Sequence, residues 1–169
     1  KTVSILGGYN ETFTTRRPDA FKSILDAQNM GRVFYIAGDA DPVIDGFVLN
    51  RGNAAAGGST PWGGNIWAVG GSGPSLTVTL RNAVVLQGSA PTGSGRGGGM
   101  AAVFANVIVE DCEFSHNTSG GSAGALRVEQ SGLRMEDTII HHNTAGSTGG
   151  VVFASFANVI MTNTVLADN

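Results

Sequence analysis

The chain has 169 residues, which is enough for one domain with a sizeable core. Charged residues make up only 14% of it and the formal net charge is -3, so the composition gives no reason to expect a nucleic-acid partner, which would usually need a basic face. The sequence contains no apolar run of about 18 residues that would predict a membrane-spanning helix, and its single cysteine, Cys112, excludes an internal disulfide.

The first segment predicts a strand followed by a polar loop. Lys1 runs directly into the apolar stretch 3–6, so we expect a mature product or an excised piece. A polar loop is predicted at 9–20. Residues 18–28 are the best helical candidate, but they form a single short stretch, and a 3.6-residue period of adequate length is found nowhere else.

Two copies of a repeat precede the regular part of the chain. Residues 43–48 match residues 80–85 at a spacing of 37, with the Gly-rich segment 54–64 as the inserted loop. Residues 78–85 match residues 107–114 at a spacing of 29, with the Gly- and Ser-rich loop 88–99 taking up the additional residues. Both insertions are predicted to be loops.

From residue 98 onward the repeat has a constant interval of 26 residues. Three asparagines recur at this interval: Asn117, Asn143 and Asn169. The apolar residues three positions before them extend back to the previous copy and form one column: Val85, Phe114, Ile140 and Leu166. Apolar residues alternate within each copy, as in Val107-x-Val109, and this period of two is typical of strands.

The repeat therefore predicts an all-β parallel β-helix over residues 1–169, a single domain. Three short strands with their turns use roughly 20–30 residues, the size of one solenoid coil, which gives about five or six coils. We expect the Val85 column to point inward and to supply the core. Glycines at 98, 124 and 150 are expected at corners that need positive φ. The recurring asparagines are expected to be corner residues in left-handed backbone that bond to their own copies. The general preference for right-handed parallel crossovers sets the hand.

Several motifs carry a resemblance to a known family. They are FSHN at 114–117, AGAL at 123–126, GGVV at 149–152, ILGGYNETFTTRRPDAFKSIL at 5–25 and VIDGFVL at 43–49. The chain resembles right-handed parallel β-helix proteins of the pectin-lyase-like superfamily. The closer likeness is to bacterial surface proteins of the polymorphic outer-membrane type, with paired GGAI and FxxN motifs. The resemblance implies the fold, but this fold hosts lyases, hydrolases, adhesins and structural spikes.

Acidic residues recur at the same interval and suggest a cation site. Glu110 and Asp111 are expected to stack on Glu136 and Asp137, and like charges at this spacing repel unless they are screened, protonated or bridged. Calcium takes carboxylate oxygens, so a calcium site is one interpretation. Solvated corner acids are the other, because Arg81 precedes Glu110 in the column.

The histidines form a second column that could bind a metal. His116 and His142 lie 26 residues apart, Asp168 continues the column and His141 lies beside it. Two histidines and an aspartate could hold zinc. The repeat alone would also bring these side chains together on the surface.

Aromatic and basic residues suggest carbohydrate contact. Trp62 and Trp67 lie in or beside the insertion 54–64, and insertions on solenoids tend to gather on a binding face. Arg127 and Glu129 are two apart on one predicted strand, so they share a face and could grip an acidic sugar. The alternatives are loop or core anchors for the tryptophans and a surface ion pair for Arg127 and Glu129.

These observations favour a non-enzymatic module outside the cell or on its surface, which serves as a rigid spacer, an adhesin segment or a fibre subunit. The rival hypothesis is a polysaccharide lyase, a glycoside hydrolase or a carbohydrate-binding module. The sequence ends at Asn169 without a polar cap, so we expect a longer polypeptide, a partner subunit that covers the end, or self-association through coil edges. Apart from calcium, no cofactor is expected.

Overall fold

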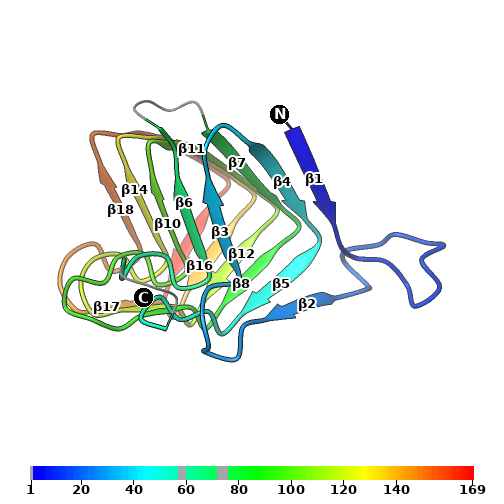
Figure 1. The fold of residues 1–169 in the computed structure, drawn as a ribbon, viewed down its shortest axis with the longest axis horizontal. Helices are drawn as coiled ribbons and strands as arrows, with labels where there is room; N and C mark the ends of the chain where they lie inside the picture. The colour runs from blue at the N-terminus through cyan, green and yellow to red at the C-terminus, as the bar shows by residue number, and fades with distance from the viewer. Residues whose placement is uncertain (1, 57–59, 72–75) are drawn as a thin grey trace.

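The computed structural model describes residues 2–56, 60–71 and 76–169 as an all-β protein. Its strands form three large sheets and one small sheet, and every strand pair within them is parallel (Figure 1). The described residues contain no helix, and the segment with the best helical pattern instead contains a turn and the strand β2 (Ser23–Asp26).

The three large sheets are built from strands that recur in chain order. Sheet 1 has six strands: β1 (Thr2–Leu6), β4 (Asp41–Asp45), β7 (Leu76–Arg81), β11 (Ala105–Glu110), β15 (Gly132–Glu136) and β19 (Asn158–Thr162). Sheet 2 also has six: β2, β5 (Phe47–Asn50), β8 (Val84–Leu86), β12 (Glu113–Ser115), β16 (Ile139–His141) and β20 (Val165–Ala167). Sheet 3 has five: β3 (Phe34–Ala37), β6 (Ile66–Val69), β10 (Met100–Val103), β14 (Leu126–Glu129) and β18 (Val152–Ser155).

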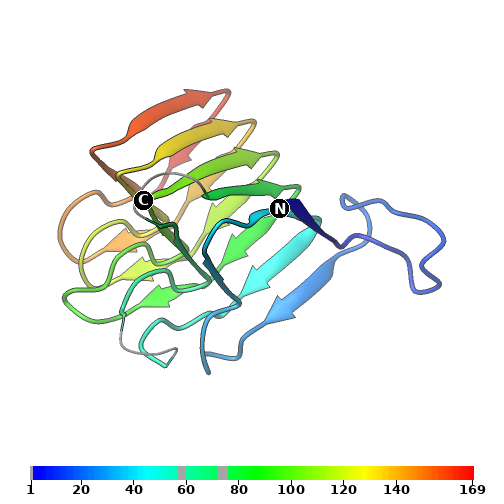
Figure 2. The same cartoon turned by 45° about the horizontal axis from the view of Figure 1, so that its top comes forward.

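A small fourth sheet lies in the chain between sheets 2 and 3. Sheet 4 has three strands: β9 (Ser89–Ala90), β13 (Thr118–Ser119) and β17 (Thr144–Ala145). The chain thus visits sheets 1, 2 and 3 in a fixed order, and each visit adds a strand beside the previous one. Figure 2 shows these strands stacked in sequence order, from blue to red. This arrangement is consistent with a parallel β-solenoid.

The register of the sheets confirms the intervals of 26 and 29 residues. Phe114 pairs with Val85 on one side and with Ile140 on the other, and Ile140 pairs with Leu166. In sheet 1, Val107 pairs with Val78 at the longer interval. The predicted column of Val85, Phe114, Ile140 and Leu166 is therefore confirmed, because each of these residues pairs with the next across adjacent strands of sheet 2.

The predicted spacing of 37 for the earliest copy is wrong by one residue. Ile44 pairs with Leu80 and Leu49 pairs with Val85, so the interval is 36. Both Ile44 and Leu49 are fully buried, whereas Val43 is not. Because side chains alternate between the two faces of a strand, a slip of one residue would have turned the core residues outward.

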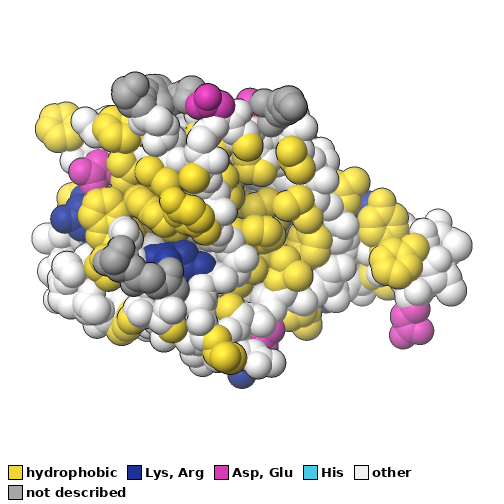
Figure 3. Space-filling model, viewed as in Figure 1, with side chains coloured by type: hydrophobic (Ala, Val, Ile, Leu, Met, Phe, Trp, Pro, Cys, Tyr) yellow, Lys and Arg dark blue, Asp and Glu magenta, His cyan; other side chains and the backbone are white. Residues whose placement is uncertain are grey.

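The core runs through the interior between the three large sheets. Phe114, Val85 and Ile140 have no exposed surface, but Leu166 is 52% exposed because β20 is the edge strand of sheet 2. Figure 3 shows hydrophobic side chains gathered in the middle of the face seen in Figure 1. Burying a side chain such as Phe114 contributes about 1.5–3 kcal/mol, so stacked files supply the main stabilisation.

The expected corner geometry of the asparagines and glycines is wrong in detail. Left-handed backbone falls on the residues before the asparagines, such as His116 at φ 56° and His142 at φ 55°. It likewise falls on Gly97, at φ 64°, and not on Gly98. A Cβ on Gly98 would lie 2.4 Å from the carbonyl oxygen of Thr118, so close backbone approach, not positive φ, requires glycine there.

The asparagines form a hydrogen-bonded ladder, as the repeat predicts, in which Asn117 and Asn143 are buried and Asn169 is exposed. The Asn117 side-chain amide donates to Asn143 Oδ1 at 2.9 Å, and the Asn143 amide donates to Asn169 Oδ1 at 2.9 Å. Asn65, from a different part of the repeat, joins the same ladder and is fully buried. Its amide donates to the carbonyl of Leu86 at 3.0 Å. The ladder satisfies backbone groups that would otherwise be orphaned inside the corner.

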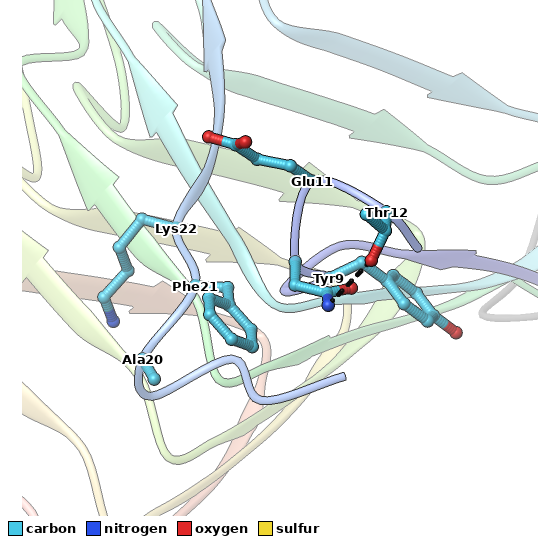
Figure 4. A pocket seen from close by; sticks show the side chains of 7 residues that line it. Tyr9, Glu11, Thr12, Ala20, Phe21 and Lys22 are labelled. Carbon is cyan, nitrogen blue, oxygen red and sulfur yellow. Dashed lines mark hydrogen bonds between the residues drawn. The ribbon is translucent and has the colours of Figure 1, made fainter. Parts of the chain in front are cut away.

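The predicted loop 9–20 projects away from the sheets between β1 and β2 (Figure 1). Its base is held by an ion pair between Arg16 and Asp45, with 2.6 Å between the nitrogen and oxygen atoms. A hollow of about 580 Å³ lies between the loop and the segment with Phe21 and Lys22, as the side chains in Figure 4 show.

The two other predicted loops are the insertions 88–99 and 54–64. The loop 88–99 contains the strand β9, and residues 57–59 of the loop 54–64 lie outside the described residues.

Candidate functional site

The outer face of sheet 3 carries the candidate site. Successive side chains of a strand point to opposite faces of its sheet. In sheet 3, Ile66, Met100 and Leu126 are fully buried in the core, so the residue that follows each of them points outward. The parallel register places these neighbours in one outward file: Tyr35, Trp67, Ala101, Arg127 and Phe153. Two of the residues proposed for carbohydrate contact thus share one file.

The two tryptophans form a packed pair. Trp62, in the loop that precedes β6, meets Trp67 edge to face with 5.2 Å between ring centroids. Trp67 is only 7% exposed, whereas Trp62 is partly exposed. The buried Trp67 ring therefore packs against Trp62 and supports it, and Trp62 is the ring of the pair that can contact a ligand.

Arg96 connects the tryptophan pair to the acidic residue of the site. Its guanidinium carbon lies 4.4 Å from the Trp62 ring centroid, in cation–π geometry. Its Nη1 lies 3.4 Å from Oε2 of Glu129. A single β-bridge between Trp62 and Arg96 fixes the two backbones side by side. The aromatic and the charged parts of the site are therefore continuous.

Arg127 is buried, with 6% of its surface exposed. Its Nη2 donates to Glu129 Oε2 at 2.8 Å, and its Nη1 donates to Ser122 Oγ at 2.8 Å. Its guanidinium carbon lies 4.3 Å from the ring centroid of Phe153. A buried charge is costly unless it is paired and hydrogen-bonded, and these contacts offset that cost.

The charges of this cluster do not balance. The guanidiniums of Arg96 and Arg127 both approach the same oxygen of Glu129, so two positive charges share one negative charge. The cluster of Trp62, Arg96, Arg127 and Glu129 therefore has a local excess of positive charge beside an aromatic ring. Such a combination can bind an anionic or sugar-like ligand.

The structure brings together all four residues predicted to contact carbohydrate, and it adds Arg96. The sequence contained a signal for Arg96, because it is the only charged residue between Pro91 and Gly99, in an otherwise Gly- and Ser-rich loop. A single charged residue in such a loop predicts a specific contact. Ser122 had no comparable signal, because it lies among other small residues.

The predicted acidic column exists, but its carboxylates do not converge. Glu110 pairs in register with Glu136, as expected. However, Glu110 accepts a hydrogen bond from Arg81, and Glu136 accepts one from Arg134 at 2.7 Å. Asp111 is exposed, at φ 52°. Asp137 continues the same left-handed corner, where a short polar side chain is tolerated. Both interpretations of these four residues, a calcium site and solvated corner acids, stay predictions.

A groove runs between the projecting loop and this corner column. Its volume is about 360 Å³, and it is lined by Lys22 and by four acidic residues: Asp19, Asp111, Glu113 and Asp137. The Lys22 ammonium donates to the carbonyl of Pro18 at 3.2 Å. The groove thus brings one basic side chain and four acidic side chains to the same surface.

The three histidines lie together as the column predicts. The rings of His116 and His142 are stacked with 5.1 Å between their centroids. His141 places Nδ1 2.6 Å from Nδ1 of His142 and Nε2 3.1 Å from Oε1 of Glu113. The His141 ring nitrogens are therefore already engaged. Across the described part of the chain, no group of three or more His, Cys, Asp and Glu side chains is arranged to hold a metal ion.

The described residues contain no helix that is long and apolar enough to cross a membrane. Comparison with protein-family models, with curated proteins and with solved structures finds no match to this chain. Its functional assignment therefore depends on its own geometry.

Proposed function

We propose that the chain is a right-handed parallel β-helix with three short strands per coil and about five or six coils. The parallel pairing in all sheets and the fixed order in which the chain visits them support this proposal. Parallel crossovers within a sheet are right-handed in the great majority of proteins, which supports the hand. The likeness of the FSHN and GGVV motifs to pectin-lyase-like surface proteins points in the same direction.

Within this fold, the chain serves as a non-enzymatic adhesin segment, a rigid module that binds a glycan outside the cell or on its surface. The observation that carries the proposal is the cluster of Trp62, Arg96, Arg127 and Glu129 on the outer face of sheet 3. An aromatic ring that stacks on a sugar, beside charged donors held in fixed positions, is typical of glycan sites. The stacked core keeps this face rigid, so little ordering is required when a ligand binds.

The same geometry favours binding over catalysis at this cluster. Both guanidiniums engage Oε2 of Glu129, so that carboxylate oxygen is held by two donors and is poorly placed to take a proton. Arg127 is packed against Phe153 and donates to Ser122, which restrains it. These contacts suit a fixed recognition surface.

Binding to a glycan array tests the proposal. The native chain should bind a subset of glycans, and Trp62→Ala should weaken that binding at least about tenfold, because aromatic contacts of this kind often dominate an interface. Phe13→Ala is the matched control, since Phe13 is an exposed aromatic, 79% accessible, in the projecting loop. Equal losses in both variants, or no glycan bound by the native chain, would refute the assignment.

The second candidate is a polysaccharide lyase or glycoside hydrolase that acts in the groove of Lys22, and the proximity of Lys22 to Asp111 and Asp137 favours it. An assay for unsaturated products from uronic-acid polymers tests it. Product formed by the native chain and lost in Lys22→Ala would favour the enzyme. Product retained in that variant, or absent from the native chain, would count against this groove.

Self-association through sheet edges, as in a fibre subunit, is a separate proposal, and sedimentation over a range of concentrations tests it.

A further inference from the structure

A cavity of about 300 Å³ lies beside the tryptophan–arginine cluster, under the loops that precede β10, β14 and β18. Its charged lining consists of Arg96 and Arg127, and it has no acidic lining residue. Four hydroxyl groups complete its polar lining: Ser94, Ser122, Ser147 and Thr148. Cationic donors and hydroxyls without a lining carboxylate are suited to an anion.

The hydroxyls that line the cavity come from successive loops of the stack. Ser94 belongs to the loop before β10, Ser122 to the loop before β14, and Thr148 to the loop before β18. Glycines from the first two loops also line the cavity, and their lack of side chains keeps it open. A Cβ on Gly93 would contact nothing, so the wall is not closed at that point.

Arg127 has donor capacity that the protein does not use. Its guanidinium carries five N–H donors, and the hydrogen bonds to Ser122 and Glu129 account for two of them. Its Nε is buried and has no hydrogen-bond partner among the described residues. Because Nε has almost no accessible surface, it is not the atom that faces a ligand. Arg127 lines the cavity, and its Nη1 and Nη2 together carry four N–H donors, of which the bonds to Ser122 and Glu129 use two.

We propose that this cavity binds the tetrahedral oxyanion of a sulfate or phosphate group. In the structure, the guanidiniums of Arg96 and Arg127 both contact one carboxylate oxygen, Oε2 of Glu129. The cavity is lined by two guanidiniums and four hydroxyls, and this number of donors suits the several oxygens of a tetrahedral group better than the two oxygens of a planar carboxylate. On the proposed glycan-binding function, on which this step rests, the group is a sulfate or phosphate ester on a sugar that stacks on Trp62.

Calorimetric titration with inorganic sulfate and, separately, inorganic phosphate tests the oxyanion site. Either anion should bind the native chain, with an affinity that falls as sodium chloride is added. Arg96→Gln should weaken binding at least about tenfold, since a charge-assisted contact is lost. Thr148→Val tests a hydroxyl without changing charge and should weaken binding by a smaller factor. Arg134→Gln is the matched control, because Arg134 is an exposed, ion-paired arginine on sheet 1.

The source of the group is then tested with oligosaccharides of equal length that carry sulfate esters, phosphate esters, carboxylates or no charge. Tighter binding of the sulfated or the phosphorylated form identifies which ester the site takes. Equal binding of charged and uncharged forms, no binding of either inorganic anion, or equal losses in Arg96→Gln and Arg134→Gln would overturn the inference. Glycan binding that depends on Trp62 but not on an ester group would leave the proposed function standing without the oxyanion site.

Discussion

Asn143→Ala is expected to destabilise the protein, because the Asn143 side chain connects two other members of the asparagine ladder, Asn117 and Asn169. Asn143 Oδ1 accepts from the backbone amide and from the side-chain amide of Asn117, at 3.0 and 2.9 Å. Its own amide donates to the carbonyl of Phe114 at 2.9 Å and to the next ladder member, Asn169. The bonds to Asn117 and Phe114 lie inside the protein, because Asn117 and Asn143 are fully buried, whereas Asn169 is exposed.

The size of the effect follows from the groups left without partners. The Asn117 side-chain amide keeps a second acceptor, the carbonyl of Val85, but the Asn117 backbone amide loses its acceptor, Asn143 Oδ1. One or two buried groups left unsatisfied at about 1–3 kcal/mol each would lower the free energy of unfolding by about 1–6 kcal/mol. At about 2–4 °C per kcal/mol for a chain of this length, that corresponds to a fall in Tm of about 2–24 °C.

Urea unfolding followed by tryptophan fluorescence measures this loss directly. Asn158→Ala is the matched control, because Asn158 is exposed in β19 and should change stability by no more than about 0.5 kcal/mol. If the two variants lost the same amount of stability, the ladder would not be a stabilising element and the reasoning would be refuted.

Three further perturbations test other parts of the structure. Gly98→Ala should cost about 1–3 kcal/mol, since its Cβ would lie 2.4 Å from the Thr118 carbonyl oxygen, whereas Gly31→Ala meets nothing within 4 Å; equal unfolding midpoints would contradict this. Burial raises the pKa of Cys112 to about 12, so the native thiol stays neutral while the unfolded thiol ionises above pH 9.0, and stability should fall between these pH values more steeply than in Cys112→Ala. Calcium should leave Tm unchanged, because Arg81 and Arg134 already pair with the glutamates of the acidic column; a rise that saturates with calcium would establish a site.

The repetitive part of the fold could be predicted because one period governs it. Phe114, Ile140 and Leu166 recur at a constant interval, and each is followed by an asparagine three residues later, so two independent markers fix the register. The earliest copy had no such second marker. Val43 and Ile44 are both apolar and adjacent, so the pattern could be aligned with either of them facing the core.

Positive φ was assigned to the wrong residues because no residue type marks these corners. His116 and His142 hold the left-handed backbone, while the asparagines that follow them use their side chains inside the ladder. Asn65 was missed for a different reason. It joins the ladder from the segment before β6 and not from the position of the other asparagines in the repeat, so no spacing revealed it.

The candidate site could be predicted only in part. Trp62, Trp67, Arg127 and Glu129 were identified by residue type and by their place beside an insertion. Their contact depends on Arg96, which reaches Glu129 from a loop of a neighbouring repeat. The length and course of that loop are not periodic, so its conformation could not be derived from the repeat.

Disulfide trapping tests most directly whether equivalent residues of successive repeats are neighbours. Thr118 and Thr144 pair in register in sheet 4, and both are exposed. Paired residues of parallel strands lie about 4.8 Å apart, which is within the range that a disulfide spans. Thr118→Cys with Thr144→Cys should therefore form an intramolecular disulfide in the native monomer under mild oxidation, whereas Thr118→Cys with Thr162→Cys should not, because Thr162 lies in sheet 1. Failure of the first pair to cross-link, or equal cross-linking of both pairs, would contradict the stacked arrangement on which the site and its proposed function depend.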